Sequence, residues 1–309
     1  MPSGEQYRNK SCRLAMPGRR SQPKADHRES IVIAGTHRLP PSGQYWPVDG
    51  HVHLHNVRFV APTMDAAARN FRAACGRSQG LVGAILLTEA SGEHVFDCLQ
   101  DLSMAGGWGF APAADEPESL IAQRGDAALA IVGGRQVRTA GGLEVLALGT
   151  RSVFPDGLPL TDTVEAIRHS GAVTVLPWGF GKWLGARRRV VAAALAKFEP
   201  DQLFVGDNGG RLSLLGVPGL VRASERRGFR VIPGTDPFPF ASDYRRVGRF
   251  GFLGEVPLPA AAPWRALRGW LIERRTSPLP YGEASGPLRF VLNQLGIQVH
   301  KRLSRRESP

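Results

Sequence analysis

The sequence predicts an α/β fold built on a largely parallel sheet, either open or closed into a barrel. Short apolar runs alternate with stretches of helical period, and a glycine follows several of those stretches. Several runs are apolar at almost every position, as in strands that helices cover on both faces. The chain has 309 residues, enough for one large domain of this class or two smaller ones.

Each predicted element has a local justification in the sequence. Asp162 and Glu165 have the spacing of a capping box, and Gly76, Gly171 and Gly228 directly follow predicted helices. The predicted strands, each an apolar run, span residues 31–34, 47–53, 82–87, 128–132, 143–148, 172–176, 203–205 and 229–232. The predicted helices span residues 63–75, 162–170, 186–198, 220–227, 264–274 and 288–295.

The positive charge of the chain is concentrated at its two ends. The formal net charge is +12, of which residues 1–30 contribute +4 and residues 301–309 contribute +3. The remaining charge is too small for a nucleic-acid-binding stripe, so nucleic acid is not an expected partner. We expect residues 1–29 to be a disordered basic tail, 30–300 a single domain and 301–309 a second basic tail.

The cysteines and the apolar runs indicate a cytoplasmic protein. Cys12, Cys75 and Cys98 are widely spaced and form no Cys-x-x-Cys pair, a pattern typical of reduced thiols. Residues 1–30 hold no apolar run that would serve as a secretory signal. No stretch has the length needed to cross a bilayer, so a membrane is not an expected partner either.

The segment VDGHVHLHN places His51, His53 and His55 at alternate positions of a predicted strand. Alternate side chains of a strand share one face, so the three imidazoles would lie on the same side of the sheet. Neutral imidazole is the commonest metal ligand in proteins. The alternative is an edge strand whose polar face meets water. The spacing favours metal binding.

Further polar residues follow other predicted strands, where a parallel sheet gathers its ligand-binding groups. Glu89 directly follows AILLT and is either a metal ligand or general base, or a surface residue. Asp207 and Asn208, in VGDNGGR, either form a turn or contact a ligand, which the adjacent glycines would let approach the backbone. Arg211 could then hold an anion, and Asp236 follows the last predicted strand.

The segment PWGFGKW has the composition of a ligand-binding wall. Trp178 and Trp183 flank Lys182 among glycines, immediately after a predicted buried strand. Packing of the tryptophans against helices is the alternative. Because an unpaired lysine is costly to bury, Lys182 is either solvated or meets an anion. The sequence therefore indicates that Trp178 and Lys182 contact an anionic substrate.

Residues 236–262 have no clear period and are rich in Phe, Pro and Gly. A loop of this length within a compact domain is usually functional or disordered. The aromatic residues argue against disorder. We therefore expect this segment to cover the strand ends as a lid.

Four motifs in the same order resemble the polymerase and histidinol phosphatase (PHP) superfamily of metal-dependent phosphoesterases. They are the His-x-His of His51 and His53, the segment GRQVRTAGGLEVLALG, the segment EAIRHSGAVTVLPWG and the segment GFRVIPGTDPF. The resemblance covers roughly residues 46–240. It implies a (β/α) barrel or distorted barrel with a metal-dependent hydrolytic site at one end.

The chain departs from the family pattern at three ligand positions. Gln136 stands where the family has a bridging Glu, Leu176 where it has a His, and Phe238 where its closing Asp-x-His has the His. The resemblance therefore implies fewer than three ions, of Zn, Mn or Fe. The ligands that remain are His51, His53 and Asp236. This set also resembles the single-metal core of the amidohydrolase superfamily, another (β/α) barrel.

These patterns together predict a metal-dependent, phosphoesterase-like hydrolase acting on a small anionic molecule. His51, His53 and Asp236 would hold the metal, and Asp236 or Glu89 would act as the base. The alternatives are a non-catalytic binding protein on the same fold, an amidohydrolase-like single-metal enzyme and, from total charge alone, a nuclease. The predicted substrate-binding residues are Lys182, Arg211, Asn208, Asp207, Gln136 and Trp178.

Overall fold

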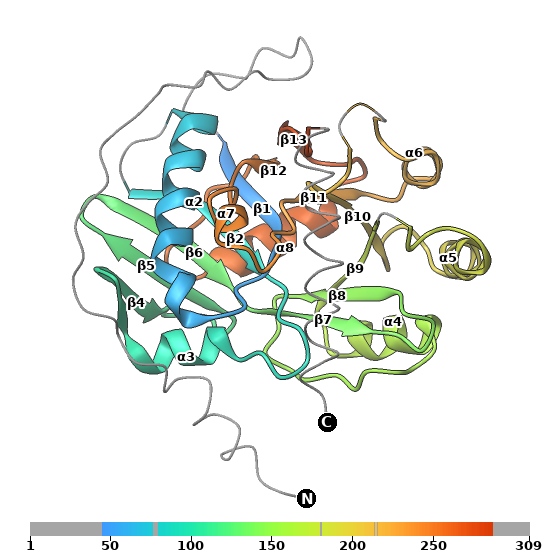
Figure 1. The fold of residues 1–309 in the computed structure, drawn as a ribbon, viewed down its shortest axis with the longest axis horizontal. Coiled ribbons are helices and arrows are strands. Elements are labelled where there is room, and N and C mark those ends of the chain that lie inside the picture. The colour runs from blue at the N-terminus through green and yellow to red at the C-terminus, as the bar shows by residue number, and fades with distance from the viewer. Residues whose placement is uncertain (1–44, 77–79, 180, 213, 215, 287–309) are drawn as a thin grey trace, which may run out of the picture.

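The computed structural model describes residues 45–76, 80–179, 181–212, 214 and 216–286. Within them the chain forms two β-sheets with helices packed against their outer faces (Figure 1). The predicted strand at 31–34, the predicted helix at 288–295 and both predicted tails lie outside the described residues.

The larger sheet has eight strands in the order β13-β12-β1-β2-β6-β5-β4-β3. Its centre is parallel, because β1, β2 and β6 run in one direction. The strands on either side of this centre pair antiparallel. The eight strands are β1 (Trp46–Val52), β2 (Gly80–Leu87), β3 (Met104–Ala105), β4 (Trp108–Pro112), β5 (Ser119–Arg124), β6 (Ala127–Val132), β12 (Phe250–Gly254) and β13 (Leu279–Gly282).

The smaller sheet has five strands in the order β11-β10-β9-β8-β7. Its strands β9, β10 and β11 are parallel, whereas β7 and β8 form an antiparallel hairpin beside β9. The five strands are β7 (Gly134–Arg138), β8 (Glu144–Leu148), β9 (Val173–Pro177), β10 (Phe204–Asn208) and β11 (Val231–Gly234).

Most of the helices that the sequence predicts are present in the structure. As expected, α2 ends at Gly76, whose φ is 68°, but Asp162 does not cap α4, which begins after Pro159 without a side-chain cap. The helices are α2 (Val60–Cys75), α3 (Val95–Leu102), α4 (Leu160–His169), α5 (Ala186–Lys197), α6 (Gly219–Arg226), α7 (Ala241–Tyr244) and α8 (Pro263–Glu273), with a 3-10 turn at Val57–Phe59.

The predicted (β/α) barrel, complete or distorted, is wrong. Both sheets are open and mixed, and they do not join into one closed sheet. The parallel strands β1, β2, β6 and β9 to β11 were predictable from their apolar runs. The antiparallel strands that end each sheet were not, because β3 has only two residues, and glycine, proline or charged residues interrupt the apolar patterns of β4, β7 and β13. A mixed sheet of this kind does not close into a barrel of alternating strands and helices.

The predicted lid at 236–262 contains regular structure. It includes α7 and β12, and β12 pairs with the first part of β1, with Trp46 opposite Gly254. Gly251 and Gly254 interrupt the apolar pattern of β12, which explains why the sequence did not reveal a strand there. Part of the segment is therefore an integral element of the larger sheet.

Both sheets are buried on two faces, as their continuous apolar runs predicted. One hydrophobic cluster lies between the larger sheet and α2 and α3, and a second lies between the smaller sheet and α4, α5 and α6. A third cluster joins the inner faces of the sheets to α8, with Leu86 and Val132 from one sheet, Leu148 and Val175 from the other, and Leu267 from the helix. The two sheets therefore pack on a shared core.

Glycines let the two sheets approach at the backbone level where β1 meets β11. A Cβ atom on Gly234 would lie 2.2 Å from the backbone nitrogen of His51. A Cβ atom on Gly50 would lie 2.6 Å from both the side chain of Ile232 and the carbonyl oxygen of Pro233. Real Cβ atoms do not approach other heavy atoms so closely, so larger residues would force β1 and β11 apart.

A buried carboxylate holds this junction together. Asp49 accepts hydrogen bonds from the backbone N–H of Thr235 (2.7 Å) and Gly248 (2.9 Å), and from the Thr235 hydroxyl. Asp49 lies on β1, Thr235 follows β11 and Gly248 precedes β12. One fully buried side chain therefore connects β1 to two segments that lie 186 and 199 positions later in the chain.

The described residues also bear on the predicted location. No helix among them is both long and apolar enough to cross a membrane. Cys75 is a free thiol, whereas Cys98 is disulfide-bonded, which the cysteine spacing did not predict. The cytoplasmic location stays a prediction.

Substituting Gly234 tests whether the contact between β1 and β11 limits stability. We expect Gly234→Ala to lower the free energy of unfolding by about 2 kcal/mol or more, because the new methyl group overlaps the backbone of His51. Gly269→Ala is the matched control, since Gly269 lies in α8 with open space beside it and alanine favours a helix. Urea denaturation that ranks Gly234→Ala at or above wild type would contradict the close contact.

Removing the carboxylate of Asp49 tests the second constraint. We expect Asp49→Ala to lower the free energy of unfolding by roughly 3 kcal/mol or more, because it leaves two buried N–H groups without their acceptor and removes the nearest acceptor of the Thr235 hydroxyl. Asp126→Ala, which removes an exposed carboxylate, should change it by no more than about 0.5 kcal/mol. Equal thermal and urea stability of the two variants would show that the Asp49 network is unimportant.

Candidate metal centre

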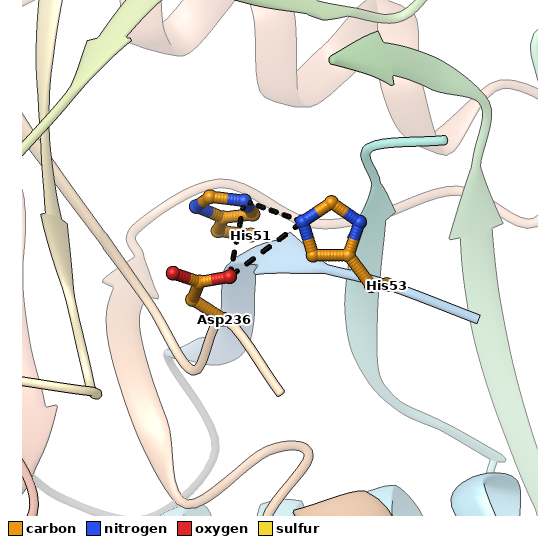
Figure 2. A group of neighbouring side chains, drawn as sticks. All are labelled: His51, His53 and Asp236. Atoms are coloured by element: carbon orange, nitrogen blue, oxygen red, sulfur yellow. Dashed lines mark hydrogen bonds and ion pairs between the residues drawn. The ribbon is translucent and has the colours of Figure 1, made fainter. Parts of the chain in front are cut away.

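His51 and His53 lie on one side of the chain at the end of β1. His51 is 4% exposed and His53 is 6% exposed, so both imidazoles are removed from water. Their Nε2 atoms are 3.1 Å apart. The alternation seen in the sequence therefore did indicate a shared face for these two side chains (Figure 2).

Asp236 completes the group from the far end of the chain. It lies just after β11, and its Oδ1 atom is 3.6 Å from Nε2 of His51 and 3.6 Å from Nε2 of His53. Its backbone N–H donates to the carbonyl oxygen of His51 at 2.8 Å. Its φ of 48° is a left-handed conformation that aspartate tolerates better than most residues. The predicted convergence of the three side chains is confirmed (Figure 2).

The spacing of these three atoms suits a metal ion. The point equidistant from Nε2 of His51, Nε2 of His53 and Oδ1 of Asp236 lies about 2.0 Å from each atom, the length of a zinc–nitrogen or zinc–oxygen bond. Two imidazoles and a carboxylate are also ligands that Zn, Mn and Fe accept. The group could therefore bind a metal ion with three protein ligands.

The surroundings keep His53 and Asp236 in the protonation states that a metal requires. Burial and, to a smaller extent, the nearby His51 lower the pKa of His53 to about 3, so the ring is neutral at pH 7. Burial alone would raise the pKa of Asp236, but His51, His53 and Lys182 together hold it below its ordinary value. A neutral imidazole and an ionised carboxylate both offer free lone pairs.

Asn208 orients the carboxylate of Asp236. Its side-chain amide donates to Oδ2 of Asp236 at 2.9 Å and to the carbonyl oxygen of Trp178 at 2.8 Å. These bonds hold Oδ2, which leaves Oδ1 directed at the histidines. Of the predicted substrate-binding residues, Asn208 and the backbone of Trp178 therefore lie beside the metal group.

His55 faces a different partner from the other two histidines. Its ring is stacked on that of His53, with centroids 5.2 Å apart, but its Nδ1 atom lies 2.8 Å from Oε1 of Glu93. His53, His55 and Glu93 form a second group that could bind a metal ion. Glu93 was not predicted as a ligand, and its only local signal in the sequence is the polar segment SGEH before α3.

Glu89 lies in an ion pair and outside both metal-binding groups. Its Oε2 atom is 2.5 Å from the Arg135 guanidinium, and its Oε1 atom accepts the backbone N–H of Phe96 at 2.7 Å. Burial raises the pKa of Glu89 to about 7, although Arg135 and Phe96 act in the opposite direction. Gln136 is adjacent only through its backbone, whose N–H donates to the carbonyl oxygen of Glu89. The predicted roles of Glu89 as base and Gln136 as substrate ligand stay predictions.

Both predicted anion-binding cations have carboxylate partners. Lys182 forms an ion pair with Glu144, and its side chain is 37% exposed. Arg211 pairs with Asp207 at 2.7 Å, donates to the carbonyl oxygen of Gly216 at 3.2 Å and is more buried. Lys182 also lies close enough to lower the pKa of Asp236.

A large cavity of about 950 Å³ opens away from the three ligands. It includes none of His51, His53 and Asp236, but Arg135 lines it and also holds the carbonyl oxygen of Glu93 at 2.8 Å. The histidine groups are the candidate functional site, because among the described residues only their side chains bring metal-ligand atoms together. Its other lining residues include His94, Asp97, Glu116, Arg151, Arg265 and Arg268.

Comparisons with known proteins show the fold and no family. No protein-family model matches the sequence, and no curated protein matches it. Among solved structures the chain is similar to PsfC from Pseudomonas syringae PB-5123, with a TM-score of 0.53 and 15% sequence identity, over 83% of this chain and 99% of that chain. At this identity the likeness shows the fold alone. The predicted resemblance to the PHP superfamily is wrong, because no family model supports it and the sheets are open and mixed.

Substituting Asn208 tests how far the metal group depends on an oriented carboxylate. We expect Asn208→Ala to weaken zinc binding by about 10–100-fold, because Oδ2 of Asp236 loses its donor and the carboxylate is free to turn. The matched control is Gln123→Ala, which removes an exposed amide from β5. Isothermal titration calorimetry giving the same zinc affinity for both variants would show that Asn208 does not position Asp236.

Proposed function

We propose that this protein is a metal-dependent hydrolase acting on a small anionic molecule, with a Zn, Mn or Fe ion held by His51, His53 and Asp236. The convergence of these three ligand atoms carries the proposal. Three protein ligands leave coordination positions open, which is typical of catalytic metal sites and unlike the closed four-ligand set of structural zinc. An ion bound there would act as a Lewis acid and lower the pKa of a coordinated water.

The residues around the ion have separate tasks in this proposal. His53 stays neutral and Asp236 stays ionised, so both can hold the ion at pH 7. Asn208 fixes the carboxylate of Asp236. Lys182 is assigned to the anionic part of the substrate, because it is partly exposed and can exchange Glu144 for another anion.

Arg211 has a different task in the same proposal. Its guanidinium holds Asp207 and the carbonyl oxygen of Gly216, and its side chain is 12% exposed. Exchanging these bonds for a substrate would leave the buried carboxylate of Asp207 without a partner. We therefore assign Arg211 to the structure of the turn that follows β10.

A second candidate function is metal binding without hydrolysis. The ion pairs of Lys182 and Arg211 favour this function, because each cation already has a carboxylate partner within the protein. The two functions make the same prediction for metal content and opposite predictions for turnover.

Metal content and turnover of His51→Ala test the proposed function. We expect wild type purified without chelator to contain Zn, Mn or Fe and to hydrolyse at least one compound in a panel of phosphate esters and carboxylated amides. His51→Ala should lose the ion at this group and most of the turnover, because two ligands hold an ion far less tightly than three. His169→Ala, which alters an exposed histidine at the end of α4, is the matched control and should keep both.

The same experiment separates the two functions. Turnover that disappears with the ion and returns when the ion is added back supports the hydrolase. Full metal content without turnover on any compound in the panel supports the binding protein and overturns the hydrolase. Wild-type protein that takes up no ion overturns both.

A further inference from the structure

A second set of ligand atoms lies beside the first and shares one histidine with it. His53, His55 and Glu93 each offer an atom within 4.8 Å of the other two. The planes of the His53 and His55 rings are within 9° of parallel, with centroids 5.2 Å apart. His55 and Glu93 are not part of the first group, which consists of His51, His53 and Asp236.

Two ring nitrogens in this second set are buried without a partner. Nδ1 of His53 and Nε2 of His55 are both inaccessible to water and make no hydrogen bond with a residue that the structure describes. Leaving such an atom unsatisfied is costly, so buried polar atoms in native proteins nearly always have partners. Figure 2 shows Nδ1 of His53 on the edge of the ring that faces away from Asp236. The group formed with Asp236 therefore uses Nε2 of His53 and leaves the other edge of the ring unused.

Glu93 supplies a fixed carboxylate on that side. Its Oε1 atom lies 2.8 Å from Nδ1 of His55, and its Oε2 atom accepts the backbone N–H of Ala90 at 2.8 Å. Its own carbonyl oxygen accepts a bond from Arg135 at 2.8 Å. Glu93 is therefore held through both its carboxylate and its backbone carbonyl, and metal-ligating carboxylates are likewise held by hydrogen bonds.

We propose that His53, His55 and Glu93 hold a second divalent cation, adjacent to the ion at His51, His53 and Asp236. Two imidazoles and one carboxylate are the ligands of a Zn-, Mn- or Fe-type ion. The inference rests on the proposed function in sharing His53, and it adds a second ion on the opposite edge of that ring. To hold both ions the shared ring binds one through each nitrogen as an imidazolate, and its remaining N–H proton is released to solvent when the second ion binds. Loss of His53 should therefore empty both sites.

Cobalt titration of single variants tests this proposal through stoichiometry, independently of activity. We expect two Co²⁺ ions per chain in wild type, measured by calorimetry and by visible absorption. His55→Ala and Glu93→Gln should each bind one ion, and His51→Ala and Asp236→Asn should also each bind one. His53→Ala should bind none tightly. His169→Ala and Glu199→Gln, which alter exposed residues, should bind two.

The outcomes distinguish failure of this inference from failure of the proposed function. One ion in wild type that survives in both Glu93→Gln and His55→Ala overturns the second site and leaves the first standing. One ion that is lost in Glu93→Gln but kept in His51→Ala supports the second site and overturns the first. Circular dichroism melting of each variant identifies a variant that has not folded, and the conservative Glu93→Gln then decides in place of His55→Ala.

Discussion

The candidate metal centre depends on one close backbone contact, the passage of β11 against β1. Gly50 and Gly234 permit it, because a Cβ atom at either position would overlap the opposite strand. Asp49 secures it by accepting bonds from segments that follow β11 and precede β12. The contact places the N–H of Asp236 against the carbonyl of His51, which brings a carboxylate to two histidines 183 and 185 positions earlier in the chain.

Burial then determines the chemistry of the group. Because His51 and His53 lie between two sheets that share a core, the imidazoles are removed from water and His53 stays neutral. Their proximity keeps Asp236 ionised despite its own burial. A ligand set in these states holds its geometry before an ion arrives, because Asn208 and the strand ends fix it. Among the described residues, the same burial leaves one ring nitrogen of His53 and one of His55 without a hydrogen-bond partner, and the proposed second ion would lie beside these rings.

The sequence predicted features that depend on local periodicity and missed those that depend on strand pairing. The alternation of histidines was sufficient to put His51 and His53 on one face, and the rule that parallel strands end together was sufficient to bring Asp236 to them. The barrel prediction was wrong because glycine, proline or charged residues interrupt the apolar pattern of antiparallel strands such as β7, β12 and β13, so these strands were not recognised. The ion pairs of Lys182 with Glu144 and Arg211 with Asp207 neutralise the predicted anion-binding cations. The pair of Lys182 with Glu144 joins two segments that are neighbours because of the order of the strands in the smaller sheet, and no local sequence pattern predicts that order.

Anomalous X-ray diffraction from crystals grown with zinc is the most direct measurement of the central claim, that these three side chains form one metal centre. Data collected on both sides of the zinc absorption edge locate the ion without reference to activity. The account predicts an anomalous peak about 2 Å from Nε2 of His51, Nε2 of His53 and Oδ1 of Asp236. Side chains in the described positions with no anomalous density between them, at zinc concentrations that occupy other sites, would contradict it.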